Sequence, residues 1–175
     1  MSHVTLAQGA GSKVSGAVSL NFVHMGDCFV SSQHWDEPEV AAGHPVTATT
    51  KGQGVADQDG GTGRDASIVT CAWSGASAPY TVTASLRVTP ATSNRYFTLA
   101  APVGAGTTAI GQVRVSARNL PETYQGDCMV TGIQVNAAKH SVWGSFSCDS
   151  FDSTGDVNSC KLGPSYFFFD NCTGP

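Results

Sequence analysis

The chain has 175 residues, a formal net charge of −4, and Asp, Glu, Lys and Arg at only 13% of its positions. This length suits a single domain, residues 1–175, and a hydrophobic share of 41% excludes a chain too polar to form a core. The nine Lys and Arg residues are scattered, which excludes nucleic acid as an expected partner, and no apolar run is long enough for a transmembrane segment.

The first segment, residues 1–13, is polar and Gly-rich, and we expect it to be flexible. It contains neither the basic nor the apolar region of an export signal. The next residues alternate between apolar and polar from Val18 to Phe22, which predicts a strand. The Gly/Ser/Val-rich stretch 4–23 is also the segment through which the chain would self-associate, if it added a strand to a neighbouring subunit.

A long segment without strand character follows, from residue 31 to residue 64. We expect it to be an irregular loop, with at most one short strand at residues 46–49. Long irregular loops in compact domains tend to carry function. This loop is therefore the first place where the sequence predicts a binding surface.

Trp35, His34 and Asp36 are the binding residues that the sequence predicts within this loop. A tryptophan in a polar loop is expected at the surface, where its ring can stack on a sugar or contact a protein. The histidines His24, His34 and His44, spaced ten residues apart, would also offer ligands for zinc or copper, but that spacing matches no common zinc module. We interpret them as solvated loop histidines.

Asp57, Asp59 and Asp65 lie in the Gly-rich sequence ADQDGGTGRD and suggest a calcium site. Calcium prefers several carboxylate and carbonyl oxygens, and glycines allow a loop to curl around the ion. The segment lacks the terminal glutamate of an EF-hand loop. A plain polar turn is the favoured alternative, and calcium is the one cofactor that the sequence suggests.

The remaining chain is dominated by alternation with a period of two. The clearest example runs from Tyr80 to Val88, where apolar residues alternate with Thr, Ser and Arg. Further strands are predicted at 67–73, 95–100, 112–117, 127–135, 141–148 and 165–171. Residues 149–164 are expected to form a loop tied at its edges by Cys148 and Cys160.

About eight strands, each with one apolar face, need a covering layer for that face. We therefore predict an all-β fold, an antiparallel β-sandwich of the jelly-roll or immunoglobulin-like kind. Trp73 and Trp143 are expected in its core beside cysteines. In the run Phe167 to Phe169, at least one ring must point away from the core, either into an interface or under a loop.

An even number of cysteines in a low-charge β chain predicts three disulfides and an oxidising compartment. The six residues are Cys28, Cys71, Cys128, Cys148, Cys160 and Cys172. The sequence does not choose among their possible pairings. A metal cluster is disfavoured because no Cys-x-x-Cys pair occurs. We expect an exported protein, extracellular or in the cell envelope, with its signal absent from this sequence.

A recognisable sequence pattern occurs in four stretches, SIVTCAWSG, YTVTASLRV, VWGSFSC and CKLGPSYFFFDNC. Over residues 50–174 the chain resembles uncharacterised exported bacterial proteins and lipoproteins. Those proteins end in a Trp/Phe-Ser-Cys strand, a Cys-containing loop and a closing aromatic-Asn-Cys strand. The resemblance implies a cell-envelope or extracellular location and brings no activity or catalytic residue with it.

No Gly-x-Ser-x-Gly elbow, His-Glu-x-x-His helix, phosphate-binding loop or dinucleotide fingerprint occurs in the sequence. The sequence therefore favours a non-catalytic module that binds a glycan or a protein partner through the 31–64 loop. One alternative is a structural subunit of a surface filament or coat, assembled by β-strand addition. The other is an exported hydrolase whose site is assembled only in the fold.

Overall fold

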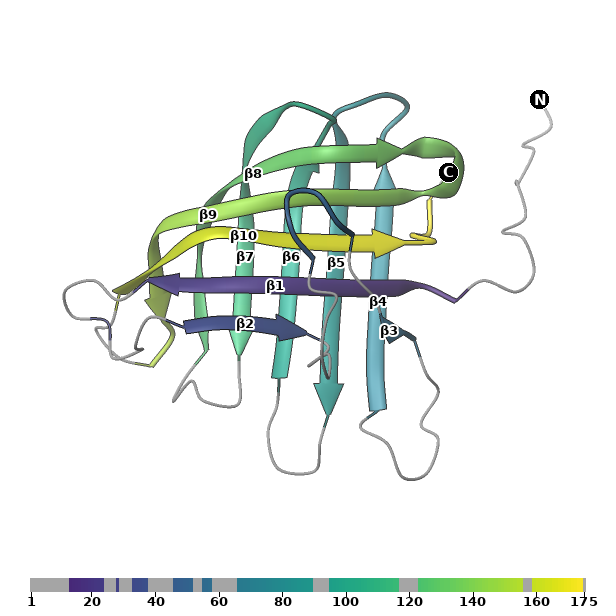
Figure 1. Cartoon of the computed structure of the whole chain (residues 1–175). Coiled ribbons are helices and arrows are strands. Elements are labelled where there is room, and N and C mark those ends of the chain that lie inside the picture. Colours follow the sequence, from purple (N-terminus) through teal and green to yellow (C-terminus); the bar gives the residue numbers. More distant parts are fainter. Residues whose placement is uncertain are drawn as a thin grey trace.

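A computed structural model describes residues 13–23, 28, 33–37, 46–51, 55–57, 66–89, 95–116, 123–155 and 159–174. Ten strands in these residues form one antiparallel sheet (Figure 1). They are β1 (Ser15–Val23), β2 (Gln33–Glu37), β3 (Val55–Ala56), β4 (Ala66–Ser74), β5 (Tyr80–Thr89), β6 (Arg95–Val103), β7 (Thr108–Ser116), β8 (Tyr124–Asn136), β9 (Ser141–Ser153) and β10 (Ser159–Asp170). A single 3-10 turn, η1 (Ala137–Lys139), connects β8 to β9.

The strand order is β2-β1-β10-β9-β8-β7-β6-β5-β4, and β3 also pairs with β1. From β4 to β10 each strand therefore pairs with the next one along the chain. Local hairpins of this kind are the simplest way to connect antiparallel strands. The N-terminal strand β1 then returns to lie beside β10, with Gly16 opposite Phe169.

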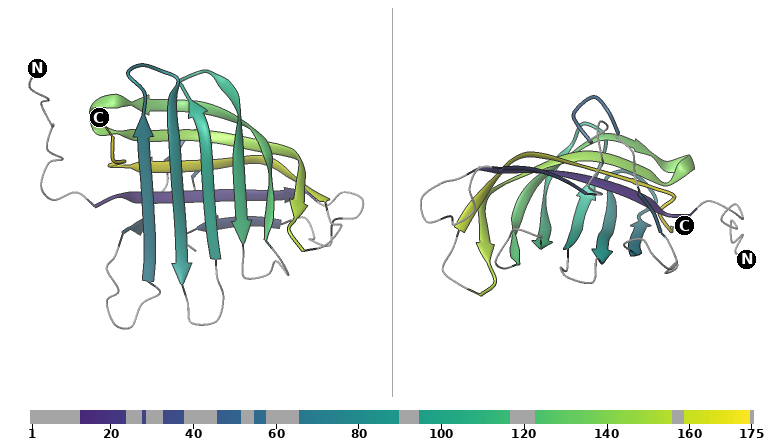
Figure 2. Two further views of the ribbon diagram at one scale, coloured as in Figure 1. Left: turned by 180° about the vertical axis from the view of Figure 1, so that it is seen from behind. Right: turned by 60° about the horizontal axis from the view of Figure 1, so that its bottom comes forward.

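The sheet curls until its two halves face each other. Figures 1 and 2 show β1, β9 and β10 running across β4, β5 and β6. The ring of Phe97 on β6 lies 5.6 Å from the ring of Phe146 on β9 and 6.3 Å from that of Phe169 on β10. These strands are not neighbours in the sheet, so the rings meet across its interior. The hydrophobic core fills that interior.

The expectation of an all-β, antiparallel, disulfide-bonded chain is confirmed, but the two-sheet sandwich is not. The structure has one continuous hydrogen-bonded sheet, curled into a half-barrel. Its strands follow chain order from β4 to β10, whereas jelly-roll and immunoglobulin-like folds use Greek-key connections. Alternation in the sequence shows which face of each strand is apolar, but it does not show which strands are hydrogen-bonded neighbours.

Each of the eight predicted strands matches a strand of the structure, and three details differ. Two short strands, β2 and β3, lie within the region 31–64 that was expected to be irregular. Residues 46–49 are not a strand, because the Thr47 hydroxyl accepts hydrogen bonds from the N–H groups of Thr49 and Thr50 and forms a turn. The expected loop 149–164 is largely strand, because β9 continues to Ser153 and β10 begins at Ser159.

All six cysteines form disulfides, as predicted, and no cysteine is left for a metal cluster. The pairs are Cys28–Cys160, Cys71–Cys172 and Cys128–Cys148. The idea that Cys148 and Cys160 close one loop is wrong, because each bonds to a different partner. Three disulfides fit an oxidising environment. Within the described residues, no helix has the length and apolar character needed to cross a membrane.

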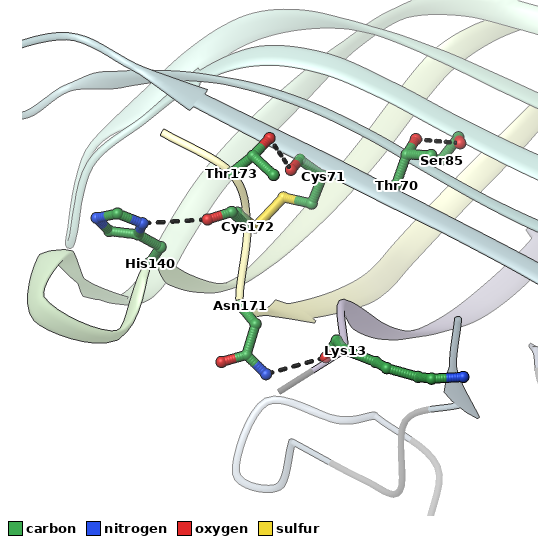
Figure 3. The surroundings of a disulfide bond; sticks show 8 residues. All are labelled: Lys13, Thr70, Cys71, Ser85, His140, Asn171, Cys172 and Thr173. Carbon is green, nitrogen blue, oxygen red and sulfur yellow. Dashed lines mark hydrogen bonds between the residues drawn. A yellow bond between two sulfur atoms is a disulfide. The ribbon is translucent and has the colours of Figure 1, made fainter. Parts of the chain in front are cut away.

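The edge strand β4 is held to the C-terminal residues that follow β10, and we call this junction the seam (Figure 3). Besides the Cys71–Cys172 disulfide, Trp73 donates its N–H to the Thr173 carbonyl, and Thr173 donates its own N–H to Cys71. His140 Nδ1 lies 3.1 Å from the Cys172 carbonyl oxygen. The seam thus joins one edge of the sheet to its opposite half.

Candidate functional site

A hollow of about 550 Å³ lies on the outer face of β5–β9, on the side of the strands that faces away from the core. We call it the polar hollow. Its polar side chains come from residues that alternate along each strand with buried ones, such as Leu99 and Val113, because successive residues of a strand face opposite sides. The polar hollow is lined by Thr83, Thr98, Leu99, Ala100, Gln112, Val113, Arg114, Gln125, Gly126, Asp127 and Asp152.

The strand register gathers these residues into two rows of cross-strand neighbours. The first row is Thr98, Arg114, Gln125 and Asp152, one residue each from β6, β7, β8 and β9. The second row is Thr83, Ala100, Gln112 and Asp127, from β5 to β8. Side chains directly opposite each other on adjacent strands lie close enough to interact. Residues far apart in the sequence therefore lie together on one face.

Gln112 and Asp127 hold each other in place. The Gln112 Nε2 amide donates a hydrogen bond to Asp127 Oδ1 at 3.3 Å. Both side chains are exposed, and the bond leaves the Gln112 carbonyl oxygen and the second Asp127 oxygen available as acceptors. Their pairing reduces the rotamer freedom that each would lose on binding a ligand.

Arg114 provides the positive charge of the polar hollow. Its guanidinium lies 5.9 Å from the centroid of the Tyr96 ring, which is the distance of a cation–π contact. Tyr96 is itself positioned by its hydroxyl, which donates to Thr123 Oγ1 at 3.1 Å. Arg114 forms no ion pair with a carboxylate among the described residues. Its planar set of N–H donors is therefore free for a ligand.

The chemistry of the polar hollow is that of hydrogen bonding. Seven of the eight residues in the two rows carry a hydroxyl, amide, carboxylate or guanidinium group, and the eighth is Ala100. In the described part of the chain, no group of three or more His, Cys, Asp or Glu side chains could hold a metal ion. The pKa of Asp149 is lowered, because Lys161 donates a hydrogen bond to its carboxylate and adds a nearby positive charge. Asp149 lies outside the polar hollow.

No protein-family model matches the chain, and neither a curated protein nor a solved structure matches it.

The predicted binding residues Trp35, His34 and Asp36 lie on β2, the edge strand beside β1. Their backbone pairs with Leu20, Asn21 and Ser19 respectively, and their side chains lie outside the described part of the structure. None of the three lines the polar hollow, which is built from β5–β9. Their role in binding remains a prediction.

Of the three predicted calcium ligands, the structure describes Asp57. Its Oδ1 accepts a hydrogen bond from the N–H of Val69 on β4 at 3.2 Å, and its own N–H donates to the Val14 carbonyl. Asp57 therefore connects the edge strand β4 to the start of β1. Asp59 and Asp65 lie outside the described residues, so the calcium site stays a prediction.

The residues of the polar hollow were not predicted from the sequence. Gln112, Arg114 and Asp127 fall on predicted strands and Gln125 lies two residues before one, and none of them was predicted as a site residue. One signal was present: long polar side chains replace the Thr and Ser that dominate the outer positions of β5. Their convergence depends on strand register, which the sequence pattern did not supply.

Proposed function

We propose that this protein is an exported, non-catalytic module that binds a glycan through the polar hollow. The observation that carries the proposal is the pair of cross-strand rows, which place donors and acceptors side by side on one face. An extracellular or cell-envelope location is supported by the three disulfides.

A glycan suits the mixture of groups better than a protein surface does. Each sugar hydroxyl both donates and accepts, so it is matched by amide, carboxylate and guanidinium groups that lie next to one another. A hollow of about 550 Å³ is in the size range of sites for small ligands. Arg114 contributes one positive charge and Asp127 and Asp152 contribute two negative ones, so the net charge of −1 disfavours polyanions.

The sheet also makes the site rigid. The lining residues project from paired strands rather than from loops, so the strand register fixes the positions of their Cα atoms. A site that is already ordered loses less conformational entropy when a ligand binds.

The test is a binding screen with the oxidised, full-length protein. Soluble β-glucan, mannan, xylan and chitin oligosaccharides are titrated by calorimetry against the protein and against the variants Arg114→Ala and Gln112→Ala. We expect Arg114→Ala to weaken binding about tenfold or more, because hydrogen bonds to charged groups are the stronger ones. Thr81→Ala is the matched control, since Thr81 is exposed on β5 but does not line the polar hollow.

Binding that survives both variants would overturn the assignment to the polar hollow, and the absence of binding to every glycan would overturn the proposal. Release of reducing ends during the titration would favour the exported hydrolase. Assembly into large particles on native sizing would favour the filament subunit. We rank strand addition through 4–23 lower, because Ser15–Val23 already pairs with β10 on one side and with β2 and β3 on the other.

A further inference from the structure

Two aliphatic side chains are exposed directly beside the polar hollow. Ile110 on β7 is 66% exposed and Met129 on β8 is 50% exposed. They are cross-strand partners, and we call them the apolar pair. Most large hydrophobic side chains in the described part of the chain are buried, so this exposure is unusual.

The apolar pair belongs to the same face as the polar hollow. Ile110 precedes Gln112 by two residues and Met129 follows Asp127 by two, so all four side chains face outward. Two residues along a strand span about 7 Å. The apolar pair is therefore the next step of the ladder from the Gln112–Asp127 pair.

Polar pairs lie on both sides of the apolar pair. On one side, Gln112 and Asp127 are hydrogen bonded at 3.3 Å. On the other, the hydroxyls of Thr108 and Thr131 are hydrogen bonded to each other at 2.8 Å. The same two strands thus change from polar to apolar and back to polar. An aliphatic step within a polar ladder offers a local contact for one apolar group.

We propose, building on the proposed function, that the glycan carries an aliphatic group, acyl or alkyl, which lies over the apolar pair while its sugar occupies the polar hollow. Ile and Met have no aromatic face and no strong donor or acceptor. A sugar hydroxyl placed on them would lose hydrogen bonds to water without replacement. An aliphatic group placed there would instead remove apolar surface of both partners from water.

The test compares methyl and hexyl glycosides of glucose, galactose, mannose and N-acetylglucosamine, each below its aggregation concentration. For a sugar that binds, we expect the hexyl glycoside to bind at least about tenfold more tightly, since each buried methylene contributes about three- to fourfold in affinity. Ile110→Thr and Met129→Thr should remove most of that gain, and threonine is well tolerated in strands. Ile68→Thr is the matched control, because Ile68 is also exposed but lies on β4.

The outcomes separate this inference from the proposed function. If methyl and hexyl glycosides bind equally, the inference is overturned while glycan binding stands. If the hexyl gain persists in Gln112→Ala without any sugar preference, the contact is nonspecific and both are overturned. Failure of every hexyl glycoside to bind overturns the inference, and failure of the oligosaccharides as well overturns both. A dimer that disappears in Ile110→Thr would show that a second copy covers the apolar pair, which contradicts the inference.

Discussion

At the scale of single residues, the core depends on glycines where aromatic rings approach the backbone. A Cβ added at Gly144 would lie 2.5 Å from the ring of Phe167 and 2.8 Å from the Thr131 carbonyl oxygen. A Cβ at Gly16 would lie 2.6 Å from the ring of Phe169. These aromatic rings belong to β10, which pairs with β1 and β9. The absent side chains therefore let the inner face of the sheet close around the two rings.

We predict that Gly144→Ala lowers the free energy of unfolding by about 1–3 kcal/mol, because the methyl group has no room beside a fully buried ring. Urea denaturation of the oxidised protein measures this change. The neighbouring variant Ser145→Ala, at a half-buried outer position, should stay within about 0.5 kcal/mol of the parent protein. Equal stability of Gly144→Ala and the parent would show that Phe167 does not pack as described.

A second prediction concerns the Lys161–Asp149 ion pair, whose charged atoms lie 2.7 Å apart. The hydrogen bond from Lys161 and its positive charge lower the pKa of Asp149 below the ordinary value of 3.8. A lowered pKa means that the stabilisation is present at neutral pH and is lost as the pH falls through the pKa of the folded state. The effect on stability should be small, because the carboxylate is fully exposed.

A pH titration of the Asp149 carboxyl carbon by NMR measures this pKa in the parent and in Lys161→Gln. We expect the pKa to rise toward its ordinary value in the variant. An unchanged pKa would mean that the ion pair does not form in solution.

The alternation of the sequence predicted side-chain direction well in one place and was misapplied in another. As expected for the Phe run, Phe167 and Phe169 are buried, and Phe168 faces outward, where Lys51 lies 5.3 Å from its ring centroid. The prediction that Trp143 lies in the core is wrong. It is the outer-face partner of Phe168, and its indole N–H donates to the Thr47 carbonyl. Alternation with the buried Phe146 already implied this direction.

At the scale of elements, the edge strand β4 shows how an exposed sheet edge is protected. Unpaired edges invite pairing with other chains. Here the Val69 N–H donates a hydrogen bond to the Asp57 carboxylate. The Trp73 N–H and the Cys71 carbonyl are hydrogen bonded to the backbone of Thr173. Asp57 was interpreted from sequence as a calcium ligand or turn residue. Its contact with Val69 could not be predicted, because the two elements meet only when the sheet curls.

We predict that Asp57→Ala destabilises the protein by about 1–2 kcal/mol, since it leaves the edge amide of Val69 without its acceptor. Hydrogen exchange of the Val69 amide should accelerate together with this loss. Asp57→Asn keeps a carbonyl acceptor and should cost less than Asp57→Ala. If chelation of calcium destabilised the parent protein as strongly as Asp57→Ala does, the calcium interpretation would be the better one.

Strand positions were predictable because strong alternation marks a half-buried strand. The exceptions follow from short or polar sequence. The five residues of β2, QHWDE, carry no alternation long enough to detect. The end of β9 is rich in Asp and Ser and was expected to be loop. The alternation breaks there, because Asp149 and Ser150 are both exposed before Phe151 is buried again, at a register shift between β9 and β10.

At the scale of the whole molecule, the seam connects parts of the chain that are distant in sequence. Cys71 and Cys172 are separated by 101 residues, whereas Cys128 and Cys148 on adjacent strands are separated by 20. In the chain-entropy account, a disulfide that closes a longer loop restricts the unfolded chain more. The bond at the seam also lies where the curled sheet meets its own edge.

We predict that removing the seam disulfide in Cys71→Ala/Cys172→Ala costs about 4–5 kcal/mol, against about 3 kcal/mol for Cys128→Ala/Cys148→Ala. Denaturation of both double variants under oxidising conditions measures the difference. Faster hydrogen exchange in β4 should accompany the loss of the seam bond. A larger loss from the Cys128–Cys148 pair would contradict the role assigned to the seam.

The polar hollow forms only when the whole sheet has folded. Its residues were individually visible in the sequence, but their meeting requires the register of five strands and the curvature of the sheet. The sequence directed attention to Trp35 in the 31–64 region, because polar loops are common binding sites. The geometry instead favours the outer face of β5–β9.

The most direct test of this assignment is to map ligand contacts by NMR, using backbone amide shifts of the oxidised protein titrated with the methyl and hexyl glycosides. We predict that the largest shifts fall at the amides of the polar hollow, namely those of Thr98, Gln112, Arg114, Gln125 and Asp127. Shifts confined to residues 33–37, with the amides of the polar hollow unchanged, would contradict it and return the binding surface to β2.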